Sequence, residues 1–279
     1  MIPGFDTAEF VRRVLEEDLG IAGDVTSTAT IGQGARFTAE VACREPIVVA
    51  GFDLAAAFFR AMDADIRIDT FVADGDKVES GRVLMRLAGR ARAMLSAERS
   101  ALNTLQHLSG IATLTRRYVD AIADTGAVLL DTRKTIPGLR SLEKYATRMG
   151  GARNHRMRLD DGILIKDNHV GIAGGVGAAV RAAKAADTGL EVQVEVDRIE
   201  QITEALDAGA DRLLLDNMDV RTLRHAVELV AGRAPLEASG GVNLDTIRAI
   251  AETGVDFISV GRITQSAPAV DIGMDYALR

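Results

Sequence analysis

A short stretch in the middle of the chain concentrates positive charge. Between residues 133 and 166 there are nine lysines or arginines and three acids, a local charge of +6 in a chain whose net charge is −7. Arg133, Lys134 and Lys166 each follow an apolar run of the strand type, and His155 with Arg156 follows a glycine pair. Cations held at strand ends and glycine turns form strong charge-assisted hydrogen bonds with carboxylates and phosphates. The stretch therefore predicts a pocket for a small polyanion.

Three other cations of this stretch have a simpler interpretation. Arg140, Lys144 and Arg148 recur at every fourth position of a predicted helix that runs from about Pro137 to Met149. Side chains at this spacing share one face of a helix. We expect these three to form a solvated basic face.

The elements that must position the reactive side chains follow an alternating pattern that begins near residue 126. Helical patterns at 199–208, 222–230 and 244–252 separate the later members of a series of apolar runs. Such alternation predicts a parallel sheet with short crossovers. We expect an α/β barrel of six or seven strands, with an open doubly wound sheet as the alternative. The six predicted strands are Ala127–Asp131, Ile163–Asp167, Leu190–Val196, Asp211–Asp216, Pro235–Ser239 and Asp256–Val260.

Two carboxylates lie at the carboxyl ends of predicted strands, where barrels of this kind have their active sites. Glu195 alternates with valines, as do Glu191 and Gln193, so this side of the strand is predicted to point inward. A carboxylate there needs a hydroxyl, a cation or a metal as partner. Glu195 and Asp216 are therefore candidates for ribose hydroxyls or for water molecules on Mg²⁺. The alternative is that either one caps a neighbouring loop.

Glycines follow the last two predicted strands. Ser239, Gly240 and Gly241 precede a helix, and Gly261 follows the final strand. Backbone N–H groups at such positions can approach a phosphate closely, and late strand loops are the usual phosphate site of a barrel. We expect one site with a phosphate at one end and carboxylates beside it.

The first part of the chain predicts a smaller domain. Residues 1–110 are expected to form an α+β domain, residues 111–266 the barrel, and the tail 267–279 is expected to pack on the smaller domain. A helix capped by Asp6 or Thr7 opens the chain, and a long helix from Met94 to about Asp124, interrupted near Ser109 and Gly110, leads into the barrel. The other predicted elements are strands at 37–43, 47–50, 66–69 and 82–87 and a helix at 53–62.

Composition limits the classes of partner. The chain has 279 residues, 47% of them apolar and 26% charged, as in an ordinary soluble globular protein. Its acidic balance argues against nucleic acid or an anionic membrane as a partner, because both need a basic face. The single Cys43 cannot form an internal disulfide, and no apolar run approaches about 18 residues. We expect a cytoplasmic protein with Cys43 in its core.

Three long motifs resemble those of the quinolinate phosphoribosyltransferase family: DTRKT-x-PGLR-x-LEKYA from Asp131, GG-x-x-NHR from Gly150, and LIKDNH from Leu164. The resemblance implies a decarboxylating transfer of phosphoribose from 5-phosphoribosyl 1-diphosphate to quinolinate. The products would be nicotinate mononucleotide, diphosphate and CO₂, in de novo NAD synthesis. It also implies Mg²⁺, an incomplete barrel and a homodimer.

The resemblance assigns roles to individual residues. Quinolinate is expected to bind to Arg133, His155, Arg156 and Lys166, together with Arg99 from the partner subunit. By sequence alone, however, Arg99 is an amphipathic helix residue whose guanidinium lies in water. The phosphoribosyl donor is expected to be bound by Lys134, Glu195, Asp216, Ser239, Gly240, Gly241 and Gly261. Thr132, Val260 and Arg262 complete the expected substrate-binding set, and Lys134, Lys166, Glu195 and Asp216 are the expected catalytic residues.

Some positions depart from the family pattern, and other functions stay open. Gln265 stands where many members have histidine, Arg262 where a small residue is common, and Arg158 where glycine is common. One alternative is a molybdenum-linked relative with another substrate. A second is a lyase that forms a Schiff base through Lys166. A third is a sensor of phosphorylated metabolites without catalysis.

Overall fold

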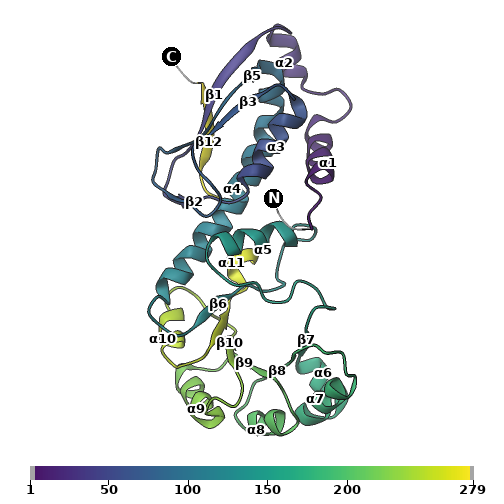
Figure 1. The fold of residues 1–279 in the computed structure, drawn as a ribbon, viewed down its shortest axis with the longest axis vertical. Coiled ribbons are helices and arrows are strands. Elements are labelled where there is room, and N and C mark those ends of the chain that lie inside the picture. Colours follow the sequence, from purple (N-terminus) through teal and green to yellow (C-terminus); the bar gives the residue numbers. More distant parts are fainter. Residues whose placement is uncertain (1–3, 277–279) are drawn as a thin grey trace. The chain divides into compact units, whose positions relative to one another are not determined.

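The protein was analysed as a computed structural model that describes residues 4–276 (Figure 1). Internal contacts divide it into two compact units. The first comprises the described residues up to Leu114, Ser141–Gly150 and those from Ser266 onward. The second comprises Thr115–Arg140 and Gly151–Gln265.

An antiparallel sheet forms one side of the first unit. Its described strands lie in the order β12-β1-β5-β3. Figure 1 shows yellow β12 beside purple β1, so the two ends of the chain meet in one sheet. Alternate side chains of β1 are buried, because successive residues of a strand point to opposite faces. The strands are β1 (Arg36–Cys43), β3 (Arg67–Thr70), β5 (Val83–Arg90) and β12 (Ile272–Tyr276), with β2 (Ile47–Val48) and β4 (Lys77–Val78) paired separately.

Helices pack beside this sheet. The side chain of Asp6 accepts a hydrogen bond from Glu9 N at 2.9 Å and so caps the first helix, as predicted. Asp24 caps a second, short helix that the sequence analysis did not identify. The helices are α1 (Thr7–Leu19), α2 (Val25–Thr30), α3 (Phe52–Met62), α4 (Ala91–Ala121) and α5 (Arg140–Met149).

The predicted interruption of the long helix near Ser109 and Gly110 is wrong. Helix α4 continues through both residues. The hydroxyl of Ser109 is used outside the helix, since it accepts from Ala50 N at 3.1 Å. Gly110 lets another segment approach, because a Cβ there would collide with the carbonyl oxygen of Pro268 and lie 3.1 Å from Ala269 Cα. Both residues that predicted a break serve packing instead.

Helix α5 was placed in the barrel range, but its contacts group Ser141–Gly150 with the first unit. Tyr145 donates its hydroxyl to Asp74 at 2.6 Å. The same carboxylate accepts from Gly51 N at 3.0 Å and Phe52 N at 2.9 Å at the start of α3. A side-chain contact distant in sequence therefore fixes α5, which no local pattern could reveal.

The predicted solvated basic face is wrong for two of its three residues. Lys144 is 1% exposed. Arg140 is half-buried and donates to Thr135 Oγ1 and to the carbonyl of Met157, both at 3.1 Å. Arg148 alone of the three is exposed. The spacing that predicts a shared face does not say whether that face meets water.

The second unit is the predicted incomplete α/β barrel. Its six described strands are parallel and lie in the order β6-β11-β10-β9-β8-β7. Within residues 4–276, β6 and β7 do not pair with each other, so the barrel is open between them. All six lie within the predicted ranges: β6 (Val128–Leu130), β7 (Ile163–Ile165), β8 (Val192–Val196), β9 (Arg212–Asp216), β10 (Leu236–Ser239) and β11 (Phe257–Ser259).

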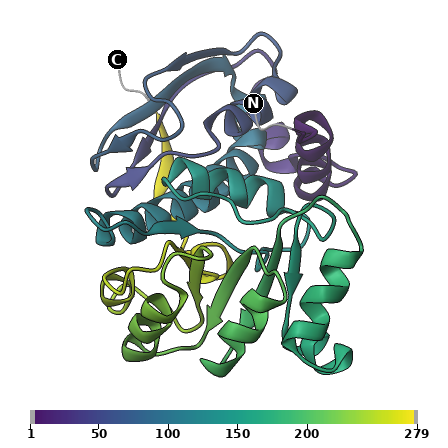
Figure 2. The same ribbon diagram turned by 60° about the horizontal axis from the view of Figure 1, so that its bottom comes forward.

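Helices alternate with these strands along the chain. Figure 2 shows the alternation in colour order, from teal through green to yellow. Strands such as β9, with three consecutive buried leucines, are apolar on both faces, as expected where a parallel sheet is covered by helices. Among the described residues, no helix is both long and apolar enough to cross a membrane. The helices are α6 (Asp167–Ala173), α7 (Val176–Ala185), α8 (Glu200–Asp207), α9 (Val220–Val230), α10 (Ile247–Ala251) and α11 (Arg262–Gln265).

Gly110→Ala tests the close approach inside α4. Alanine in a helix is normally about 1 kcal/mol more favourable than glycine, but here its methyl group would meet the backbone at Pro268. We expect the free energy of unfolding to fall by about 1–3 kcal/mol, the usual range for overpacking, measured by urea denaturation. Gly171→Ala, in exposed α6 with no atom within 4 Å of the added Cβ, is the control and should not destabilise. Stabilisation by both substitutions would contradict the close approach.

Candidate active site

A cavity of about 650 Å³ opens at the carboxyl ends of the barrel strands. This volume suits a small organic ligand. All residues that line it belong to the second unit. It brings together every predicted substrate-binding residue of that unit: Thr132, Arg133, Lys134, His155, Arg156, Lys166, Glu195, Asp216, Ser239, Gly240, Gly241, Val260, Gly261 and Arg262.

Arg99 is the predicted site residue outside this set. It lies on α4, in the first unit, and its side chain is exposed. Its role in a partner's site stays a prediction.

A buried carboxylate connects the two basic motifs. Asp131 is 0% exposed. It accepts from His155 N at 2.8 Å and from Asn154 Nδ2 at 2.5 Å. The residue at the end of β6 thereby fixes the loop that carries His155 and Arg156. The spacing of the motifs in sequence gave no sign of this contact.

Two arginines make one end of the cavity strongly cationic. Burial lowers the pKa of Arg156, and the charge of Arg133 lowers it further, while Asp161 partly offsets both. Arg133 Nε is buried without a hydrogen-bond partner among the described residues. Since two partly buried like charges repel, an anion with more than one carboxylate would be favoured here.

A lysine and two carboxylates lie at the strand ends opposite. Lys166 Nζ is 2.8 Å from Glu195 Oε2. Burial raises the pKa of Asp216 above its ordinary value, and the negative charge of Glu195 adds to this. Lys166 and Lys134 oppose the shift without cancelling it. The Schiff-base alternative would require this ion pair to open, because a Schiff base forms on a free amine.

The glycines that were predicted to approach a phosphate have separate steric reasons. Gly240 has a φ of 93°, and a Cβ there would collide with Asn217 Oδ1. Asn217 itself has a φ of 55° and donates to Asp216 Oδ2 at 2.6 Å. At Gly261 a Cβ would lie 2.8 Å from Lys134 Cδ. Gly240 thus gives room to the residue that orients Asp216, and Gly261 gives room to Lys134.

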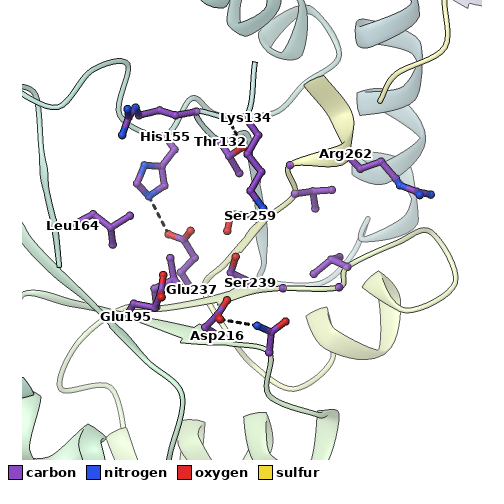
Figure 3. Close-up of a pocket in the computed structure, with 18 of the residues that line it drawn as sticks. Thr132, Lys134, His155, Leu164, Glu195, Asp216, Glu237, Ser239, Ser259 and Arg262 are labelled. Atoms are coloured by element: carbon purple, nitrogen blue, oxygen red, sulfur yellow. Dashed lines mark hydrogen bonds and ion pairs between the residues drawn. The ribbon is translucent and has the colours of Figure 1, made fainter. Parts of the chain in front are cut away.

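Figure 3 shows how the labelled side chains lie. Lys134 extends into the cavity, whereas Arg262 points away from it. Arg158, which stands where the family commonly has glycine, pairs with Asp160 at 2.8 Å and does not line the cavity. Gln265 does line it.

Several lining residues were missed by sequence reasoning. The most buried of them is Glu237, at 0% exposure, in the middle of β10. The sequence did contain a signal for Glu237, namely a lone carboxylate in an apolar strand. The same signal identified Glu195. Glu191, in contrast, was expected to point inward and is exposed just before β8. The other missed lining residues are Leu164, Leu214, Val242 and Ser259.

Known proteins match along nearly the whole chain. A family model described as the quinolinate phosphoribosyl transferase N-terminal domain matches residues 24–109, and its C-terminal counterpart matches residues 111–275. A nicotinate-nucleotide pyrophosphorylase (carboxylating) from Mycobacterium leprae is 44% identical over 97% of this chain and 98% of its own length. A quinolinate phosphoribosyltransferase (decarboxylating) from Nicotiana tabacum is 42% identical over 98% of this chain and 82% of its own.

A solved structure agrees with these matches. The nicotinate-nucleotide pyrophosphorylase of Francisella tularensis superimposes with a TM-score of 0.93 at 40% identity, over 97% of this chain and 96% of that one. Both halves of the chain, its full-length relatives and its fold point the same way. This chain belongs to the quinolinate phosphoribosyltransferase family.

Proposed function

We propose that this chain transfers phosphoribose from 5-phosphoribosyl 1-diphosphate to quinolinate and releases diphosphate and CO₂, forming nicotinate mononucleotide. One observation supports this most directly. The cavity has a cationic end at Arg133 and Arg156 and a carboxylate end at Glu195 and Asp216, all in one space of about 650 Å³. A dianionic acceptor fits the first end and a phosphorylated sugar fits the second.

Quinolinate carries two adjacent carboxylates on a pyridine ring. Arg133 and Arg156 can each bind one through charge-assisted hydrogen bonds. Lys166 adds a third cation once it leaves Glu195. Holding the ring in this way directs its nitrogen towards the sugar bound at the other end, which makes the reaction effectively intramolecular.

The carboxylates and Lys134 act on the donor. As the nitrogen forms its bond to the anomeric carbon, the bond to diphosphate breaks and its electrons leave with the diphosphate. Positive charge develops on the sugar, and Glu195 and Asp216 face it, while Lys134 faces the leaving group. The pyridinium then accepts the electrons of the breaking bond to CO₂ at the carbon beside the nitrogen, and a proton from water replaces the carboxylate.

Mg²⁺ is part of the proposal. Asp216 and Glu195 fit a cation that arrives with the donor: burial raises the pKa of Asp216, and the negative charge of Glu195 nearby raises it further. Among the described residues, no three His, Cys, Asp or Glu side chains form a metal site. Since Mg²⁺ usually keeps several waters and binds one or two carboxylates plus phosphates, such a site need not be built in advance. When bound, it would neutralise diphosphate charge. Undiminished turnover in a chelator, with no other divalent ion present, would exclude it.

A homodimer in the cytoplasm completes the proposal. Arg99 is exposed on a helix of the first unit, where a second copy of the chain could take it up. Cys43 is free and buried, which suits a reducing compartment. The acidic balance supports small-molecule substrates as the partners, without nucleic acid or a membrane surface. Cell fractionation that places the protein in another compartment would contradict the location.

Incubation with quinolinate, the phosphoribosyl donor and Mg²⁺ should yield CO₂ and nicotinate mononucleotide in equal amounts. Nicotinate should not replace quinolinate, because a monocarboxylate leaves at least one partly buried cation unpaired, at a cost of about 1–3 kcal/mol. Labelled CO₂ release and chromatography of the nucleotide measure the two products. Comparable turnover with nicotinate would contradict the dicarboxylate assignment.

Arg133→Ala should lower kcat/KM for quinolinate by about 30-fold to 1000-fold, which corresponds to roughly 2–4 kcal/mol of transition-state binding. Steady-state kinetics with saturating donor measures it. Arg158→Ala is the matched control, since Arg158 pairs with Asp160 outside the cavity and should leave kcat/KM unchanged. Equal losses in both variants would mean that general charge, and not a contact of Arg133, attracts the substrate.

Arg99→Ala and Lys166→Ala homodimers should each be nearly inactive if Arg99 completes a neighbour's site. In mixed dimers both lesions fall in one site and the other is intact, so random exchange should restore about a quarter of wild-type sites, by counting on a two-fold dimer. Activity after subunit exchange, verified with a mass tag, measures the recovery. A mixture as inactive as its parents would show that Arg99 acts within its own chain or in packing.

A further inference from the structure

Glu237 is a charged residue in the barrel interior to which the proposed reaction assigns no role. Arg212 Nη2 lies 2.8 Å from Glu237 Oε2, and Gln193 Nε2 donates to the same oxygen at 2.9 Å. Burial alone would raise the pKa of Glu237, but its contacts with His155, Arg212 and Gln193 together hold that pKa below its ordinary value. These contacts to Oε2 favour the charged form of a buried carboxylate, whose other oxygen, Oε1, has no hydrogen-bond partner among the described residues.

The contacts of Glu237 continue to His155. Gln193 uses its amide N–H on Glu237, so its carbonyl oxygen faces His155 Nε2, at 3.1 Å. His155 Nε2 is also 3.5 Å from Glu237 Oε2, as the dashed line in Figure 3 marks. Both neighbours are acceptors, so Nε2 must carry the hydrogen.

The second ring nitrogen agrees with this assignment. His155 Nδ1 accepts from Arg156 N at 2.8 Å, which requires a lone pair there. A carboxylate that fixes an amide thus fixes one tautomer and one orientation of the imidazole. The same imidazole holds the backbone N–H of Arg156, whose guanidinium lines the cationic end of the cavity.

We propose that Glu237 is a positioning residue for the dicarboxylate end: through Gln193 it holds His155 in its Nε2–H tautomer, and through His155 it holds the backbone of Arg156. Glu237 also neutralises Arg212. The cations that face the ligand are then those of the cavity wall, without a contribution from Arg212 in the barrel interior. This rests on the proposed function for the identity of the ligand.

A double-mutant cycle tests the coupling. Glu237→Gln keeps the size of the side chain and removes its charge. We expect the quinolinate KM to rise about tenfold and the donor KM to stay within about twofold. In a His155→Ala background the same substitution should change the quinolinate KM by less than about twofold. Glu228→Gln, on an exposed glutamate of α9 that does not line this cavity, is the matched control and should change neither.

Two outcomes of the cycle would overturn the proposal. A tenfold rise in both backgrounds would mean that Glu237 acts without His155, and an equal rise of both KM values would indicate a general structural effect. Circular dichroism melting of each variant shows how much of it is folded.

A spectroscopic measurement separates this proposal from the proposed function. Imidazole ¹⁵N signals of the wild type, assigned by their loss in His155→Ala, should show Nε2–H, and Glu237→Gln should show mixed tautomers. An unchanged tautomer would overturn the positioning role even if quinolinate is turned over. If the wild type does not use quinolinate but Glu237→Gln still changes the tautomer of His155, the proposed substrate is rejected and the positioning role stands.

Discussion

Cations held close together in a partly buried cavity repel one another, and the barrel has to supply the free energy that keeps them there. Arg133 follows β6, and Arg156 stands on a loop that crosses the open side of the barrel between β6 and β7. Asp131, at the end of β6, is fully buried and accepts from the backbone N–H of His155, which ties that loop to the strand. The apolar strands provide a rigid edge on which this unfavourable arrangement of charge is maintained until an anion relieves it.

Most of the barrel could be predicted from the sequence because its signals are local. Apolar runs and helical spacing need no knowledge of distant residues, and all six strands lie in the expected ranges. The cavity could be predicted for the same reason: parallel strands bring their carboxyl ends to one edge, so residues after each strand meet there. Reading those positions found Lys134, Glu195 and Asp216.

The errors have a common physical cause. Lys144 is buried, and Ser109 and Gly110 of α4 contact segments far away in sequence. Periodicity carries no information about either feature. Glu237 was missed because attention to strand ends overlooks the strand interior, where a carboxylate is costly and therefore informative. Asn217 has a positive φ, which asparagine adopts more readily than most residues, but its contacts with Ser239 and Asp216 could not be read from the sequence.

The ion pair between Lys166 and Glu195 makes the two ends of the cavity interdependent. Under the proposed function, the ammonium belongs to the set expected to bind the dicarboxylate, and the carboxylate belongs to the set expected to bind the sugar. A ligand at either end has to draw one partner away, and this leaves the other ready for the second ligand. Because linkage between two binding equilibria is reciprocal, each ligand must raise the affinity for the other by the same factor. With these proposed roles, a single salt bridge would act as a thermodynamic coupling between the two halves of the site.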